Sequence, residues 1–412
     1  MRSGDIKALT GLRIVAAVWV VLFHFRPLLR DAAPGFLDAL TPVLNCGAQG
    51  VDLFFILSGF VLTWNYLDRM GGAWSTRATL HFLWLRLARV WPVYLVTLHL
   101  AALWVIFTLH VGHIPSQEIY RFTAISYVRQ VLMTQLWFQP FFDDSSWDGP
   151  AWSISAEWLA YLLFGLIVLV IFRMARATRA RNLVWLGVAA SLPPVVSLLV
   201  TGQFYTPWSW LPRIVMQFTA GALVAAAVSR LKLTDRGRTV AGFASALLIA
   251  GVVGFLYWAD AHPLHGVSDT GGLVDILFVP LVLTLAIGTG SLPALLATRP
   301  LVYGGQISFC LYMVHELVHT AWIWTAQQFE LTMFGGQGRL LLAAVLAVTL
   351  VGAAILYHVV EEPARLWMRR MVGDGRPVVD AGDSEDAART GKLQSIDGPN
   401  EDRPKPLSAR AG

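Results

Sequence analysis

The feature that most constrains this chain is a succession of long apolar segments that takes up most of its 412 residues. A helix of roughly 20 mostly apolar residues spans the hydrocarbon core of a bilayer, because each residue adds about 1.5 Å to its length. Such segments lie near residues 9–28, 46–66, 90–111, 152–172, 183–201, 210–229, 240–259, 273–292, 304–326 and 340–362. The sequence therefore predicts an all-α, polytopic transmembrane helical bundle of about ten spans, with the lipid bilayer as a partner.

Composition argues against a water-soluble protein. Hydrophobic residues make up 56% of the chain and charged residues 14%, whereas soluble domains carry about 25% charged residues. The 17 Trp and 10 Tyr are residue types that favour membrane interfaces. The basic residues flank the apolar segments and form no cluster on a soluble face, so we expect no nucleic-acid partner.

Lys and Arg are distributed unequally between the two ends of the predicted spans. With the N-terminus inside, the inner ends hold roughly three times as many basic residues as the outer ends, as the positive-inside rule describes. We therefore predict a multi-pass protein of the cell (cytoplasmic) membrane with both termini in the cytoplasm. The first segment contains Arg13 and is followed by no small-residue cleavage site, so we expect a span and not a cleaved signal peptide.

Two regions differ from the apolar segments. Residues 119–141 are amphipathic and contain Trp and Phe, which predicts an interfacial or re-entrant helix instead of a span. Residues 371–412 are rich in Gly, Pro, Asp, Ser and Arg, which predicts a disordered cytoplasmic tail. Residues 1–370 are then a single transmembrane domain.

The first apolar segment carries Arg13 and His24, which are eleven residues apart. At about 100° per residue, the two side chains share one helix face and are separated by about 16 Å along the axis. An imidazole titrates near neutral pH and can accept a proton from a hydroxyl. A snorkelling arginine and a packing histidine are the alternative, although ionisable groups at membrane depth usually have a function.

Further ionisable and polar residues lie in other apolar segments. Asp52 could orient an imidazole or cap the start of its helix. Glu157 could also be a cap, but it lies deep and Ser153 already suits that position, so we expect a catalytic role for Glu157. We expect Ser153 and His315 to contact the substrate.

Arg86 and Arg89 precede Pro92 at a predicted cytoplasmic boundary. Residues three apart share a helix face. Two guanidinium groups there suit a phosphorylated ligand, because arginine binds phosphate in bidentate fashion. Ordinary positive-inside anchoring is the alternative.

Six motifs, in order along the chain, resemble those of the acyltransferase-3 family of integral membrane O-acyltransferases. They are Arg-x10-His (Arg13, His24), GVDLFFILSGF from Gly50, Arg-x-x-Arg before Pro92, WSISAEW from Trp152, ISFCLYMVHE from Ile307 and Glu-x-Pro at Glu361. The resemblance covers roughly residues 8–370. Ala156 is a minor departure, since a larger apolar residue is commoner there.

The resemblance implies a transferase that moves an acyl group from acyl-CoA to a hydroxyl of a carbohydrate-containing acceptor. In the family, acceptors include surface polysaccharides, lipid-linked glycans and sugars on natural products such as macrolides. The first-helix histidine is regarded as essential and the Arg-x-x-Arg is associated with the donor, which implies those roles for His24 and for Arg86 and Arg89. Acyl-CoA is a substrate, and we expect no bound cofactor and no metal.

The mechanism that follows has His24 as general base, oriented by Glu157 or Asp52. Arg13 is expected to bind the acyl-CoA donor together with Arg86 and Arg89. The chain has no G-x-S-x-G elbow, so direct transfer is expected in place of an acyl-serine intermediate. Two other classes remain open. A proton-coupled exporter of a polar small molecule would use the same His, Asp and Glu as a relay. In a structural membrane protein, the same charges would only fix helix packing.

Overall fold

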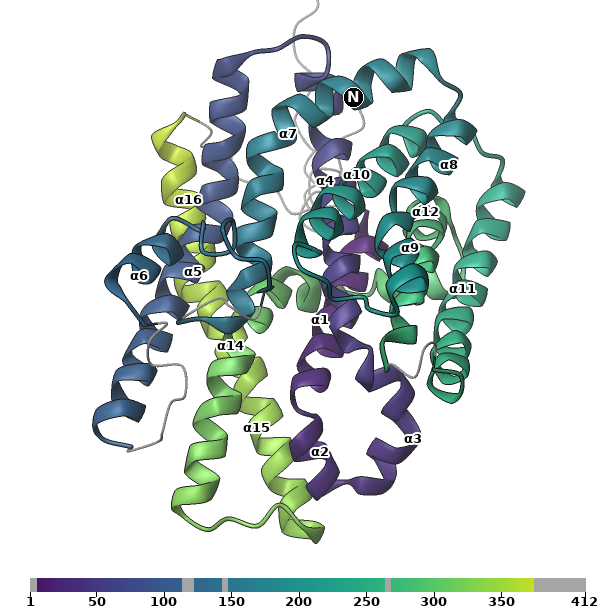
Figure 1. Ribbon diagram of the computed structural model, residues 1–412. Helices are drawn as coiled ribbons and strands as arrows, with labels where there is room; N and C mark the ends of the chain where they lie inside the picture. Colours follow the sequence, from purple (N-terminus) through teal and green to yellow (C-terminus); the bar gives the residue numbers. More distant parts are fainter. Residues whose placement is uncertain (1–5, 113–121, 143–146, 264–267, 374–412) are drawn as a thin grey trace, which may run out of the picture. The chain divides into compact units, whose positions relative to one another are not determined.

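The computed structural model describes residues 6–112, 122–142, 147–263 and 268–373 (Figure 1). Within these ranges the chain forms helices and no strand, which confirms the prediction of an all-α fold. The longer helices are α1 (Lys7–His24), α4 (Gly50–Met70), α5 (Thr76–His110), α7 (Trp152–Ala177), α10 (Trp210–Val228), α11 (Asp235–Ala261), α14 (Arg299–Gln328) and α15 (Gly335–Leu356).

Shorter helices connect these long ones. They are α2 (Arg26–Ala32), α3 (Pro34–Asn45), η1 (Gly47–Gln49), α6 (Ala124–Val131), η4 (Gly149–Ala151), α8 (Ala180–Ala190), α9 (Leu192–Thr201), η6 (Ser268–Leu277), α12 (Phe278–Ile287), α13 (Ser291–Leu296), η7 (Tyr357–Glu361) and α16 (Glu362–Met371). Pro92 lies inside α5 and does not end it.

Nine helical stretches of the described residues are long and apolar enough to cross a membrane, which makes this a multi-pass membrane protein. They are Lys7–His24, Gly47–Met70, Thr76–His110, Gly149–Ala177, Ala180–Thr201, Trp210–Val228, Asp235–Ala261, Thr270–Ile287 and Gly335–Met371. The predicted segment 304–326 is absent from this set, although it lies within the 30-residue helix α14. Its polar side chains, among them His315 and Glu316, make α14 less apolar than the other long helices.

The amphipathic region predicted at 119–141 contains α6, a helix of only 8 residues, which is too short to span a bilayer. Trp91 on α5 donates from its indole to the carbonyl of Val131 at the end of α6. Trp137 donates to the carbonyl of Ser155 on α7. These bonds hold the region against α5 and α7, and residues 119–121 lie outside the described ranges.

Glycine residues let the central helices approach each other closely. A Cβ at Gly59 on α4 would lie 1.9 Å from the carbonyl oxygen of Phe218 on α10, and a Cβ at Gly221 on α10 would lie 1.9 Å from that of Ile56. A Cβ at Gly305 on α14 would lie 1.9 Å from the carbonyl oxygen of Thr10 on α1. Small residues at membrane helix contacts are expected, because backbones can then touch.

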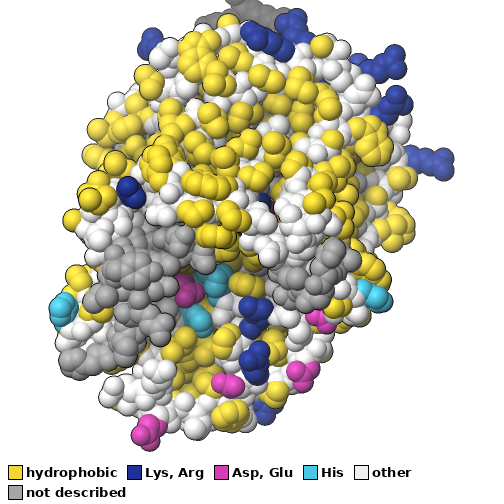
Figure 2. All heavy atoms as spheres, viewed as in Figure 1, with side chains coloured by type: hydrophobic (Ala, Val, Ile, Leu, Met, Phe, Trp, Pro, Cys, Tyr) yellow, Lys and Arg dark blue, Asp and Glu magenta, His cyan; other side chains and the backbone are white. Residues whose placement is uncertain are grey.

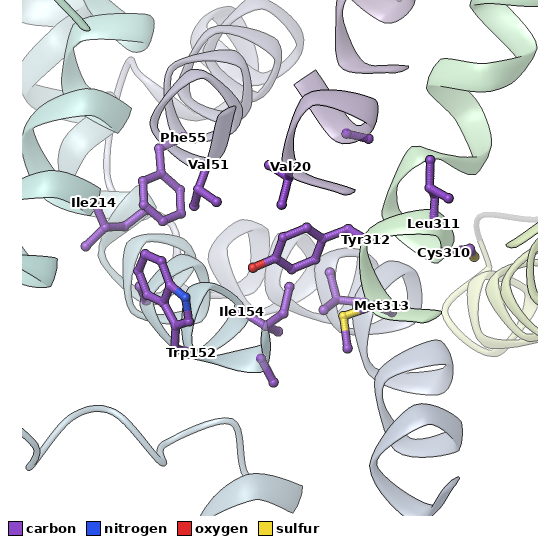
Figure 3. Close-up of a cluster of buried hydrophobic side chains, with 14 of the residues drawn as sticks. Val20, Val51, Phe55, Trp152, Ile154, Ile214, Cys310, Leu311, Tyr312 and Met313 are labelled. Atoms are coloured by element: carbon purple, nitrogen blue, oxygen red, sulfur yellow. The ribbon is translucent and has the colours of Figure 1, made fainter. Parts of the chain in front are cut away.

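A buried apolar cluster forms where α1, α4, α7, α10 and α14 meet. Figure 3 shows the ring of Tyr312 pointing into this cluster between Val20 and Ile154, with its hydroxyl toward the side of Trp152. Phe55 packs edge-on against Trp152, with ring centroids 6.2 Å apart. The cluster positions α1 against α14, which is the contact that brings His24 and His315 together.

The chain divides into two compact units, Met1–Met368 and Arg369–Gly412. The predicted disordered tail, 371–412, lies outside the described residues from 374 onward and stays a prediction. On the face drawn in Figure 2, apolar side chains cover the upper part, and Lys and Arg gather toward the top. The orientation of the spans in the membrane stays a prediction.

Replacing Gly59 or Gly221 by Ala should lower the stability of the folded protein, by about 1–3 kcal/mol each, because the added methyl would push α4 and α10 apart. The measurement is thermal unfolding of the purified protein in detergent. Gly251→Ala on α11 is the matched control, since a Cβ there meets nothing within 4 Å. Equal stability of Gly59→Ala and Gly251→Ala would contradict the close contact.

Candidate active site

His24, the last residue of α1, meets His315 of α14. The two rings lie 4.9 Å apart between centroids, and His315 Nε2 is 3.3 Å from His24 Nδ1. His315 is fully buried, and His24 is partly buried. The structure thus pairs two side chains that lie 291 residues apart in the sequence.

Hydrogen bonds to backbone carbonyls assign the protons of this pair. His315 Nδ1 is 2.5 Å from the carbonyl oxygen of Tyr312, so Nδ1 carries the proton and Nε2 is an acceptor in the neutral ring. His24 Nδ1 is 2.9 Å from the carbonyl oxygen of Val20, so it too carries a proton, which His315 Nε2 shares. The lone pair of His24 is then on Nε2, so Nε2 is the nitrogen that can accept a proton as a base.

Glu316 and His319 extend this group along α14. Glu316 Oε2 lies 3.5 Å from His319 Nδ1. We call His24, His315, Glu316 and His319 the histidine cluster. On the face drawn in Figure 2, histidine and acidic side chains lie next to one another below the apolar region.

The histidine cluster also contains donors of the type that bind transition metals. One ligand atom from each of His24, His315 and Glu316 lies within 4.8 Å of the other two. The short contact between the two rings needs no ion, because the donor and acceptor roles of the facing nitrogens already match. The prediction of no metal stays untested.

Arg13, near the start of α1, lies in a different polar group. Among the described residues its charge interacts most with Arg89, Glu157, Tyr161 and Glu361. Arg89 Nη1 is 3.2 Å from Glu361 Oε1.

Arg86 lies close enough to Tyr161 for the guanidinium charge to act on the phenol. We call Arg13, Arg86 and Arg89, with the carboxylates Glu157 and Glu361, the arginine cluster. The Nε atoms of Arg13 and Arg86 are buried and have no hydrogen-bond partner among the described residues. With three guanidinium groups and two carboxylates, the arginine cluster has an excess of positive charge.

Glu157 does not orient His24, contrary to one of the two predicted arrangements. Its Oε1 accepts a hydrogen bond from the hydroxyl of Ser58 on α4 and one of 2.6 Å from the hydroxyl of Tyr161. The partners of the His24 ring are the Val20 carbonyl and His315. Glu157 therefore belongs to the arginine cluster.

Asp52 does not orient His24 either. Its carboxylate forms a two-point ion pair with Arg213 of α10, at 3.0 Å from Nε and 2.5 Å from Nη2. Both side chains are buried, with Arg213 1% and Asp52 0% exposed. The guanidinium also lies 5.3 Å from the ring centre of Trp152. The pair joins α4 to α10, and this bidentate partner is the physical reason that Asp52 is unavailable to the imidazole.

Ser153 does not cap α7, since the helix begins at Trp152 and its N-cap, Ala151, makes no side-chain bond. The hydroxyl of Ser153 instead donates to the hydroxyl of Tyr312 over 2.9 Å, and Tyr312 donates to the carbonyl of Pro150 over 2.8 Å. Ser153 thus fixes α14 against the start of α7, and its predicted substrate contact stays a prediction.

Asp148 lies just before η4 and is 5% exposed. Burial, together with the charge of Glu316, raises the pKa of Asp148 to about 7. Its carboxyl group is therefore partly protonated near neutral pH and can donate as well as accept a hydrogen bond.

Several of these residues were missed in the sequence. Arg213 was not singled out from the sequence, although it lies inside a predicted apolar segment, as does Asp275 near it. An ionisable residue in an apolar segment is itself a signal, so both could have been found. His319 is four residues after His315, a spacing that places both on one side of a helix.

Comparisons with known proteins show which sequences the chain resembles. A family model for the acyltransferase-3 family, described as an acyltransferase domain, matches residues 6–358. The acyltransferase MdmB of Streptomyces mycarofaciens is 28% identical over 403 residues, which cover 92% of this chain and 95% of that protein. Protein 2 in the picA locus of Rhizobium radiobacter is 30% identical over 200 residues, covering 48% of this chain and 94% of that protein. No solved structure matches the chain.

Replacing Asp52 by Ala should destabilise the fold by about 3–5 kcal/mol, because the buried guanidinium of Arg213 would lose its partner. The double variant Asp52→Leu, Arg213→Met should recover much of that loss, since apolar side chains of similar volume replace the pair. Folded yield and unfolding temperature in detergent measure both. A folded, stable Asp52→Ala protein with lost activity would instead favour the orienting role that the sequence suggested.

Proposed function

This chain belongs to the acyltransferase-3 family, and on that premise we propose that it transfers an acyl group from acyl-CoA to a hydroxyl of a carbohydrate-containing acceptor. The observation that carries the proposal is the pair of contacts at His24 Nδ1, which lies 2.9 Å from the carbonyl oxygen of Val20 and 3.3 Å from His315 Nε2. With Nδ1–H held by Val20 and His315, the lone pair on Nε2 is free to take a proton. His315 is a positioning residue here, since it acts through the His24 ring.

The proposed reaction is a direct transfer. His24 Nε2 accepts the proton of the acceptor hydroxyl as its oxygen attacks the thioester carbonyl. An oxygen–carbon bond forms, the carbon–sulfur bond breaks, and the proton passes to the departing thiolate to give free CoA. The imidazole ends neutral, as it began, and needs no covalent intermediate.

The arginine cluster is the proposed site for the donor's phosphates. Its excess positive charge and its unpartnered Nε atoms on Arg13 and Arg86 suit an anionic ligand. Arg13 and His24 are separated by about 16 Å along one helix. Acyl-CoA, with phosphates at one end of a flexible arm and a thioester at the other, fits that arrangement.

Membership of an acyltransferase family argues against the two other classes. An exporter or a purely structural membrane protein would not catalyse the transfer of an acyl group. We propose the cell membrane as the location, with the arginine cluster toward the cytoplasm, where acyl-CoA is found.

The first test is His24→Ala, which should reduce acyl transfer from labelled acyl-CoA by at least about 100-fold, the size of a general-base contribution. His99→Ala is the matched control, because His99 makes the same bond to the carbonyl four residues earlier and is exposed. A folded His24→Ala protein with near-normal transfer would show that His24 is not the base.

The second test is Arg86→Gln, which should raise the KM for acyl-CoA while leaving kcat within a few-fold. Arg89→Gln should also lower stability, since Glu361 is 0% exposed and would lose its ion-pair partner. Arg69→Gln, on an exposed arginine at the end of α4, is the control. An unchanged donor KM in Arg86→Gln would contradict phosphate binding at the arginine cluster.

A further inference from the structure

One side of α14 presents buried polar atoms that have no close hydrogen-bond partner among the described residues. They are both ring nitrogens of His319, Nε1 of Trp322 and Oε2 of Glu316, which faces His319 Nδ1 at 3.5 Å. Successive members are three residues apart, so at 100° per residue they span an arc of about 120°. We call these three residues the α14 face. His319 is only 9% exposed.

The α14 face adjoins the proposed base. A carboxylate oxygen of Glu316 and a ring nitrogen of His24 lie within 4.8 Å of each other. The His319 ring stacks on Phe25, the residue that follows His24, with centroids 5.1 Å apart and planes 26° apart. A molecule bound at the α14 face would therefore touch His24.

Leaving such atoms unpaired costs about 1–3 kcal/mol for each buried group, so a ligand that pairs them gains that energy. The face offers a carboxylate acceptor, an imidazole that can donate or accept, and an indole donor. Phosphate and carboxylate ligands are disfavoured by the charge of Glu316. A neutral molecule with several hydroxyls, each both donor and acceptor, fits this set.

We infer that the acceptor carries two hydroxyls on adjacent carbons, of which one reacts at His24 while the other is held by Glu316. This rests on the proposed function. Adjacent hydroxyl oxygens are about one hydrogen-bond length apart. They can therefore reach two groups that lie within 4.8 Å of each other. Glu316 is a specificity-determining residue in this arrangement, because it fixes which hydroxyl faces the base.

The side chain of Glu316 is suited to this task by its partial exposure. It is 31% exposed, so part of the side chain is open to solvent, while its Oε2 is buried and faces His319. The imidazole of His319 holds the carboxylate in place, and the second carboxylate oxygen is left for the ligand. A metal ion is the competing occupant of His24, His315 and Glu316, and its binding can be measured directly.

The experiment uses the full-length protein in detergent, labelled acetyl-CoA and longer acyl-CoA donors, and a panel of methyl hexopyranosides with their monodeoxy counterparts. Removing the hydroxyl next to the acylated position should lower kcat/KM by roughly 10- to 100-fold, the value of a hydrogen bond to a charged group. In Glu316→Gln the preference for the complete sugar over the deoxy sugar should shrink by about the same factor.

Two controls separate this role from a structural one. Glu316→Gln should leave the unfolding temperature unchanged, and its effect should appear in kcat/KM for the acceptor and not in the KM for the donor. Glu330→Gln, at an exposed position just after the end of α14, should leave the sugar preference unchanged.

The outcomes are distinct. Equal kcat/KM for a sugar and its deoxy counterpart, or a preference that survives in Glu316→Gln, would overturn the inference and leave the transferase intact. Acyl-CoA hydrolysis with no transfer to any glycoside would overturn both the inference and the carbohydrate acceptor of the proposed function. If the protein bound one zinc ion per chain and Glu316→Gln lost it, His24, His315 and Glu316 would form a metal site, and the inference of a diol site would be wrong. A wild-type protein that neither transfers nor hydrolyses acyl groups would overturn the proposed function itself.

Discussion

The structure depends on pairing the charges that its apolar bundle buries. A charged side chain without a partner in a low-dielectric interior costs several kcal/mol, so each one selects the helix that it packs against. Asp52 and Arg213 join α4 to α10, and Arg89 and Glu361 join α5 to the π-helix η7. Because these pairs are long-range in sequence, they determine which apolar helices meet, a choice that hydrophobicity alone leaves open.

The histidine cluster differs from these pairs. Its polar atoms are only partly matched by one another, and several have no hydrogen-bond partner among the described residues, so a ligand can complete their hydrogen bonds. α1 connects the two environments, with Arg13 in the arginine cluster and His24 in the histidine cluster. One rigid helix thus keeps the positive site and the base at a constant separation.

Much of the fold could be predicted from the sequence, because length and apolarity are local properties. The helices formed at the expected segments, and α14 differed only in being less apolar than a typical span. The partners of individual side chains could not be predicted. Asp52 and Glu157 were both plausible partners for His24 by their depth in the membrane, yet both are held by other helices. Only the packing of α1 against α14 shows that His315 is the neighbour.

The glycines at the helix crossings bear on how such a protein can diverge. Where a methyl group would lie 1.9 Å from a neighbouring carbonyl oxygen, as at Gly59 and Gly305, no other residue fits, whatever molecule the protein acts on. The side chains of Glu316, His319 and Trp322 on α14 have no such restriction. Substitutions there can change which acceptor is bound without disturbing the close crossings that hold the helices around the base.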